Sequence, residues 1–183
     1  MRRRSARSQC ANPSFLPVPV MNRMLTLLLC SLALAACDRQ RIDKLEPGVS
    51  VEADVRQQFG EPAQITEKAD GSRIFEYPRQ PEGSTNYFVT LGADGKFLAI
   101  RQALTPATFA QVKPGLDQSE VRRLLGRPAS MQRYAMKPDE EVWDWRFLDG
   151  QQKKVFTVTF NREHRVQTSA TADDPRETLG GGK

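Results

Sequence analysis

The apolar and polar positions after residue 41 follow helical and strand-like patterns in an order that occurs twice. Each copy begins with a short helical turn that ends at Pro-Gly, followed by a stretch with apolar residues at amphipathic-helix spacing. These apolar positions are Val51, Val55 and Phe59 in the first copy and Leu116, Val121, Leu124 and Leu125 in the second. The pattern therefore predicts two short helices in each copy.

Glycine and proline frame both predicted amphipathic helices. A glycine stops each helix and a proline follows two residues later, the combination expected at a helix end. The positions that define these turns are Pro47, Gly48, Gly60, Pro62, Pro114, Gly115, Gly126 and Pro128. Ser50 and Asp117 are the expected helix N-caps because their side-chain oxygens can accept bonds from backbone N–H groups.

Strand-like alternation follows each helix, with Asp-Gly turns at residues 70–71, 94–95 and 149–150. Phe75 and Tyr77 share one face of a predicted sheet, and Trp143, Trp145 and Phe147 share the equivalent face of the other. We expect this Trp143-to-Phe147 stripe to pack as core beneath the helices, with a partner-binding groove as the alternative. The predicted class is α+β: two tandem units, each two short helices on a three- or four-stranded antiparallel sheet.

Four blocks align between the copies at an offset of about 67 residues, the signature of an internal repeat. They pair residues 42–48 with 109–115, 54–63 with 120–129, 74–77 with 142–145, and 87–91 with 156–160. We therefore expect repeats at residues 37–104 and 105–172, and a disordered tail at 173–183.

Residues 24–36 form an apolar run too short to cross a bilayer, since thirteen helical residues span about 20 Å. The run follows Arg23 and ends in Ala35, Ala36 and Cys37, which resembles the bacterial lipobox. Residues 1–36 are thus an expected signal peptide, with Met21 as the expected true start and Cys37 as the lipidated first residue of the mature chain. Asp38 leaves the inner membrane as an alternative to the outer membrane.

The charge of the chain argues against nucleic-acid binding. The net charge of +5 comes from the leader, which holds five arginines and no acidic residue before residue 37. From Cys37 onward, 22 basic residues balance 22 acidic ones. The repeats therefore lack the excess positive charge that a phosphate backbone attracts.

No pattern in the repeats predicts catalysis, a cofactor or a metal. His164 is the only histidine and falls in a predicted hairpin, where a solvated turn residue is expected. Residues 139–141 are adjacent carboxylates expected to be solvated in a turn. The basic pairs Arg122-Arg123 and Lys153-Lys154 are expected on exposed faces, with anionic lipid headgroups as an alternative contact.

The Pro-Gly, Val-Arg helix and Gly-x-Pro succession, present in both copies, resembles the SmpA/OmlA (BamE-like) family over residues 42–171. That resemblance implies two helices on a three-stranded antiparallel sheet and a lipoprotein accessory to the β-barrel assembly machine of the outer membrane. Tandem copies are also similar to the β-lactamase-inhibitor-protein arrangement.

The resemblance and the residues together predict a non-catalytic, lipid-anchored envelope protein that binds other proteins. The polar, proline-containing loop at residues 78–86 is the expected partner contact, through Arg79, Gln80, Glu82 and Ser84. The alternative function is an inhibitor or regulator of a periplasmic hydrolase, such as a β-lactamase or a peptidoglycan enzyme.

Overall fold

The computed structural model describes residues 40–180. The expected signal peptide, Met21 and Cys37 lie outside the described residues. The chain divides into two units after Gln40, and the unit that begins at Arg41 carries all the structure described below. Among the helices at residues 40–180, none is long and apolar enough to span a membrane.

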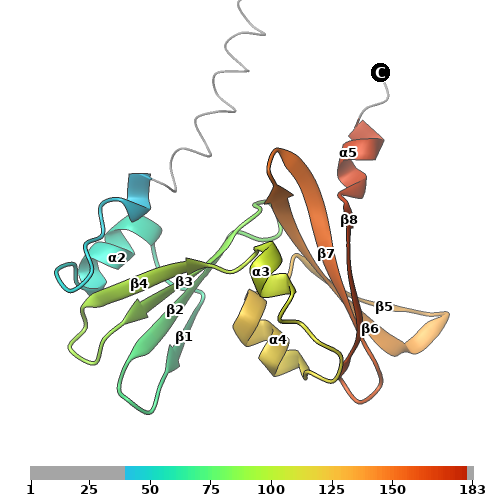
Figure 1. The fold of residues 1–183 in the computed structure, drawn as a ribbon, viewed down its shortest axis with the longest axis horizontal. Helices are drawn as coiled ribbons and strands as arrows, with labels where there is room; N and C mark the ends of the chain where they lie inside the picture. Colours follow the sequence, from blue (N-terminus) through green and yellow to red (C-terminus); the bar gives the residue numbers. More distant parts are fainter. Residues whose placement is uncertain (1–39, 181–183) are drawn as a thin grey trace, which may run out of the picture. The chain divides into compact units, whose positions relative to one another are not determined.

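The first half of this unit is a four-stranded antiparallel sheet with helix α2, Glu52–Phe59, against one face (Figure 1). The strands pair in chain order and are β1 (Gln64–Glu67), β2 (Arg73–Pro78), β3 (Asn86–Leu91) and β4 (Phe97–Gln102). A helical stretch ends at Ile42, before the turn at Pro47 and Gly48.

The second half repeats this order with longer strands. Helices α3 (Pro106–Phe109) and α4 (Gln118–Leu125) lie on one side of the second sheet (Figure 1). Its strands also pair antiparallel in chain order and are β5 (Ser130–Tyr134), β6 (Lys137–Asp149), β7 (Gln152–Phe160) and β8 (Val166–Asp173). The α+β class is therefore observed, with four strands in each sheet.

The turn before each main helix is joined to the last strand of its sheet in the same way. Gly48 N–H donates to the carbonyl oxygen of Phe97 at 2.8 Å, and Gly115 N–H donates to that of Val166 at 2.8 Å. The N-cap residue of each main helix also contacts the turn or strand end beside it: Val51 forms an isolated β-bridge with Lys96, and Asp117 forms one with Arg165. The two halves thus share their topology and also these backbone contacts.

The two main helices begin differently, and one expectation from the sequence is wrong here. Asp117 caps α4 as expected: its Oδ1 accepts from Glu120 N–H at 2.8 Å, and Glu120 Oε2 accepts from Asp117 N–H at 2.8 Å. The N-cap of α2 is Val51, whose side chain has no acceptor. Ser50 instead accepts a bond from Glu46 N–H at 2.9 Å, because one extra residue in this turn moves Ser50 away from the helix end.

Each sheet has its own core, and the predicted aromatic faces form it. Phe75 and Tyr77 are buried with Val55 and Phe59 of α2. The alternative of a partner groove at the Trp143-to-Phe147 stripe fails, because all three side chains are at most 7% exposed and pack under α3 and α4.

The expected disordered tail has regular structure over most of residues 173–180. Strand β8 continues to Asp173, Asp174 is 2% exposed, and α5 spans Pro175–Gly180. Asp174 is held by Arg176, whose Nη2 lies 3.1 Å from its Oδ2, and by Arg146, whose Nε forms an ion pair with the same oxygen at 3.3 Å without hydrogen-bond geometry. These two cations neutralise the buried carboxylate at the start of α5.

Candidate protein-interaction surfaces

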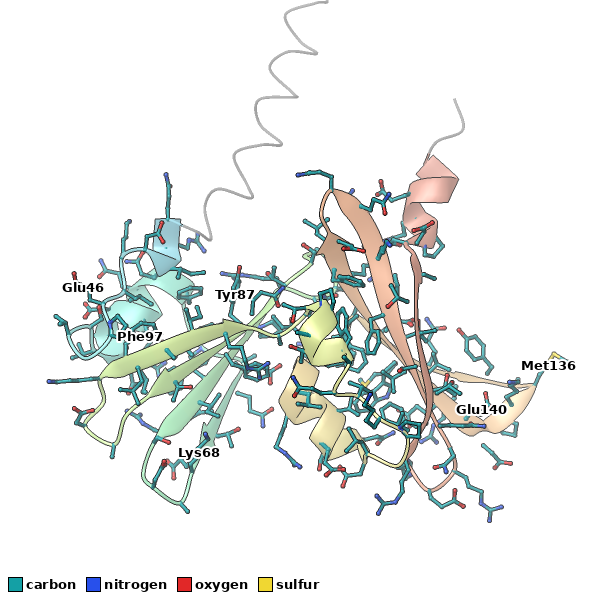
Figure 2. The ribbon with its side chains drawn as sticks, viewed as in Figure 1. Glu46, Lys68, Tyr87, Phe97, Met136 and Glu140 are labelled. Atoms are coloured by element: carbon teal, nitrogen blue, oxygen red, sulfur yellow. The ribbon has the colours of Figure 1, made fainter. Side chains whose placement is uncertain are left out.

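The hairpin formed by β5 and β6 exposes three large apolar side chains. Met131 is 62% exposed, Tyr134 50% and Met136 96%, and we call these residues the hairpin patch (Figure 2 labels Met136). The pairing of β5 with β6 is irregular in this hairpin, because its register shifts between Gln132 and Tyr134 of β5. Large exposed apolar side chains are candidates for contact with other proteins, and methionine adapts its shape to different partners.

Glu141 supports the base of this hairpin. Its carboxylate accepts hydrogen bonds from Trp143 Nε1 at 2.8 Å, Arg133 Nη2 at 2.9 Å and Gln118 Nε2 at 3.1 Å. Burial of the carboxylate opposes ionisation, but these bonds outweigh it and the pKa of Glu141 lies below its ordinary value. The network connects the hairpin to α4, so the patch stands on a fixed base.

The carboxylates at residues 139–141 lie in strand β6, so the expectation of a turn is wrong for them. Glu140 pairs with Lys137 at 3.1 Å, and His164 Nδ1 lies 4.0 Å from Glu141 Oε2 beside a hollow of about 210 Å³. His164 itself is in a turn, with φ of 58° and a side chain 56% exposed. Within residues 40–180, no three His, Cys, Asp or Glu side chains cluster as a metal site would require.

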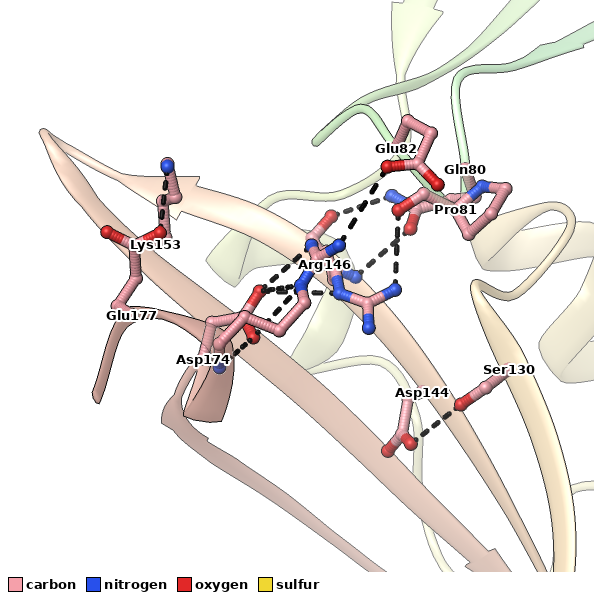
Figure 3. A network of polar contacts seen from close by, with 10 residues as sticks. Gln80, Pro81, Glu82, Ser130, Asp144, Arg146, Lys153, Asp174 and Glu177 are labelled. Carbon is pink, nitrogen blue, oxygen red and sulfur yellow. Dashed lines mark hydrogen bonds and ion pairs between the residues drawn. The ribbon is translucent and has the colours of Figure 1, made fainter. Parts of the chain in front are cut away.

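The loop expected to contact a partner packs partly against the second half of the protein (Figure 3). Gln80 is 7% exposed, and its side-chain amide donates from Nε2 to the carbonyl oxygen of Arg146 at 2.7 Å and accepts from Arg146 N–H at 3.3 Å. The Gln80 side chain thus takes the place of a neighbouring strand. It bonds to β6 at Arg146, beyond the last residue of β6 that pairs with β5. Gln80 is thus engaged inside the chain, whereas the side chain of Glu82 is 90% exposed.

The end of α4 contacts the face of the first sheet that points away from α2. Asn86 is fully buried, and its Nδ2 donates to the carbonyl oxygens of Leu125 at 2.7 Å and Arg127 at 2.9 Å. Glu76 accepts from Arg127 N–H at 2.6 Å and lies 3.5 Å from Arg122 Nη2. We call this contact the α4 joint. The sequence patterns did not predict the α4 joint. The available signal was the position of two polar residues, Glu76 and Asn86, next to core residues of neighbouring strands.

A hollow of about 230 Å³ opens beside the α4 joint, with Ile74 and Phe88 among its lining residues. Arg101 stacks over the Phe88 ring at 4.7 Å and donates from Nη1 to the carbonyl oxygen of Leu124 at 3.1 Å. The pKa of Arg122, which also lines the hollow, is lowered by burial. Arg122 pairs with Glu76 in the α4 joint. The other basic pair also forms contacts within the chain, because Lys153 pairs with Glu177 and Lys154 pairs with Asp149.

Residues 102–170 match the family model of the outer membrane protein assembly factor BamE domain. This stretch runs from the end of β4 into β8. The second half therefore contains a BamE-like domain with two short helices on an antiparallel sheet.

No curated protein matches the chain. The solved structures to which it is similar include a DUF4309 family protein (YjgB) from Bacillus subtilis subsp. subtilis str. 168, at 15% identity over 76% of this chain and 92% of that one, with a TM-score of 0.30. Another is an extracellular protein containing an SCP domain from Bacillus anthracis str. Ames, at 13% identity over 74% of this chain and 48% of that one, with a TM-score of 0.26. Both TM-scores are too low to support a conclusion about fold or function.

Proposed function

We propose that this chain is a lipid-anchored, non-catalytic envelope protein that acts as an accessory factor in outer-membrane β-barrel assembly. The observation that carries the proposal is the hairpin patch, which lies inside the segment that matches the BamE domain model. Large exposed apolar side chains are candidates for contact with another protein, and the hydrogen bonds of Glu141 hold the base of the hairpin that carries them.

We further propose that the first half is a second, diverged BamE-like unit, with repeats at residues 37–104 and 105–172. The shared strand order and the matching turn-to-strand contacts support this duplication.

The anchor is the lipid on Cys37, exposed by removal of a signal peptide that ends at residue 36, with Met21 as the proposed translation start. The outer membrane, facing the periplasm, is the proposed location, with the inner membrane as the alternative because of Asp38. Mass spectrometry of the purified membrane form tests this point: a Cys37→Ser variant should lose the acyl mass and leave the membrane fraction.

A photoactivatable residue at position 136 tests the partner. Crosslinking in cells should capture a component of the β-barrel assembly machine, and deletion of the gene should lower the amount of folded outer-membrane protein. The matched control is the same residue at Ile65, which is 42% exposed on β1 of the first sheet. Equal capture of that component from both positions, or none from position 136, would contradict the proposal.

The loop remains a second candidate contact, through Arg79, Glu82 and Ser84. A photoactivatable residue at Ser84 should capture the same component if loop and hairpin form one surface. Capture of a hydrolase, together with loss of that hydrolase's activity in the presence of the purified chain, would instead favour the inhibitor function.

A further inference from the structure

Strand β8 is an open edge that lacks the usual protection against pairing. It pairs with β7 alone among the named strands, and each residue after Val166 is exposed. Edge strands normally carry charges or prolines or are short, because their free backbone groups invite another strand. Residues 167–172 have neither charge nor proline, and their side chains are those of Gln167, Thr168, Ser169, Ala170, Thr171 and Ala172.

The other edge strands of the two sheets are protected. Strand β1 has four residues and ends in Glu67, and β5 has five residues, including Arg133. Strand β4 carries Arg101, and the turn at Gly48 already bonds to its first residue, Phe97. Strand β8 has eight residues and its one charged residue is Asp173 at the end, so it has the longest uncharged run among the described edge strands.

Backbone directions identify which groups of β8 are free. Asp174 N–H donates to the carbonyl oxygen of Lys153 on β7, and partners along an antiparallel pair alternate in direction. Residues 168, 170 and 172 therefore bond to β7, while the N–H and C=O groups of Ser169 and Thr171 point away from the sheet. The segment at 115–117 occupies the outer edge beside Val166 and Arg165, so the free edge runs from Gln167 to Asp173.

We propose that this edge binds a second copy of the chain, with the two β8 strands antiparallel and centred on Ala170. In that register Ser169 of one copy exchanges backbone hydrogen bonds with Thr171 of the other, and the whole free edge is used without meeting residues 115–117. The two Ala170 residues form the close pair, with Cα atoms about 4.5 Å apart, a spacing that suits small side chains.

Charge favours a second copy as the occupant. Arg165 immediately precedes β8 and Asp173 ends it. Neither side chain forms an ion pair within residues 40–180, and Arg165 Nη1 donates to the carbonyl oxygen of Gly115 at 2.9 Å. In the antiparallel register, Asp173 of each strand lies opposite Gln167 of the other, two residues from its Arg165. A parallel arrangement would place like charges together, so the strand is complementary to itself in one orientation only.

Sedimentation velocity of the full chain in mild detergent tests the proposal. The wild type should be a dimer, and Ala170→Lys should raise the dimer dissociation constant at least roughly tenfold, because two like charges would be juxtaposed. The matched control is Ala99→Lys, the same change on the exposed part of β4, which should leave the dimer intact with the same circular dichroism spectrum.

A second variant keeps the test independent of any folding defect. Ala170→Cys should form a disulfide with Ala170→Cys of a second copy, identified by mass spectrometry as the peptide joining both residues 170, since the spacing lies within disulfide reach. Ala99→Cys should not join to itself. A wild type that stays monomeric, a dimer unaffected by Ala170→Lys, or one equally weakened by Ala99→Lys would overturn the proposal. None of these outcomes depends on the proposed assembly function.

Discussion

The aligned carboxylates Glu76 and Asp144 occupy the same place in the two sheets and have different tasks. Asp144 accepts bonds from Ser130 Oγ at 2.9 Å and Thr157 Oγ1 at 2.7 Å, so it ties together three strands of its own sheet. Glu76 accepts from Arg127 N–H and pairs with Arg122, so it binds the first sheet to the second half. At this aligned pair, one carboxylate serves its own sheet and the other serves the contact between the two halves.

The glycines that end the main helices show the same contrast. Gly60 has φ of 81° and Gly126 has φ of 75°, both in a region that strongly favours glycine. A Cβ at Gly60 would meet no atom within 4 Å, whereas one at Gly126 would lie 3.0 Å from Glu76 Oε1 and 3.1 Å from Asn86 Nδ2.

Gly126→Ala should therefore give the largest loss of stability. Backbone strain costs about 1–3 kcal/mol at either glycine, and crowding in the α4 joint should add about 1–2 kcal/mol at Gly126. Urea unfolding of Gly126→Ala and Gly60→Ala measures the difference. Equal losses of unfolding free energy in the two variants would contradict this prediction, because they would mean that the α4 joint accommodates the added methyl group without destabilisation.

Asn86→Ala should lower the free energy of unfolding by about 2 kcal/mol, because the carbonyl oxygens of Leu125 and Arg127 would lose a buried donor. The aligned position in the second sheet is Val155, which is only partly buried. Val155→Ala should cost about 1 kcal/mol or less. Chemical denaturation of both variants checks the order, and a larger loss in Val155→Ala would contradict the importance of the α4 joint.

The last strands of the two sheets are followed by buried residues of different kinds, apolar after β4 and ionisable after β8. The stability contributed by the segment after β8 should therefore depend on pH. Strand β4 runs into buried Ala103 and Leu104, while β8 runs into buried Asp174. Burial alone would raise the pKa of Asp174, but hydrogen bonds from Arg176 and the charge of Arg146 outweigh it, so its pKa is lowered.

A carboxyl with a lowered folded-state pKa stabilises the protein above its unfolded-state pKa and loses that contribution as the pH falls through the folded-state value. Asp174→Asn should therefore cost about 1–2 kcal/mol at pH 7, and the difference from wild type should shrink on acidification. Asp149→Asn is the control, because Asp149 pairs with Lys154 at 3.1 Å but its side chain is 51% exposed. Denaturation at neutral and acidic pH gives both differences; a gap for Asp174→Asn that widens in acid would contradict the pKa shift.

The smallest effect is expected for Tyr77→Phe, at the position aligned with Trp145. Trp145 Nε1 donates to the carbonyl oxygen of Gly126 at 3.0 Å, whereas the buried Tyr77 hydroxyl has no hydrogen-bond partner among residues 40–180. Removing that hydroxyl should change the free energy of unfolding by less than about 1 kcal/mol, or stabilise the protein. Burial raises the pKa of Tyr77 to about 12, so ultraviolet titration of the variant should lack this late transition.

The cores and most of the helices and strands could be predicted from the sequence, whereas α5, the start of β6 and the contacts between distant segments could not. Period-two aromatics placed Phe75 and Trp145 in their cores, because strand periodicity is local information. Gln80 and Arg146 lie 66 residues apart and Asn86 and Leu125 lie 39 apart, so no short pattern reports their hydrogen bonds. Ser50 failed as a cap because a single inserted residue shifts which oxygen reaches the helix end.

The α4 joint also limits how many binding events one molecule supports. Two similar units suggest bivalency, with avidity from equivalent surfaces on one chain. Here Glu76 and Asn86 use one face of the first sheet to hold the second unit, and the aligned face around Asp144 has no such occupant among the described residues. A ligand recognising that face would therefore bind with a stoichiometry of one per chain.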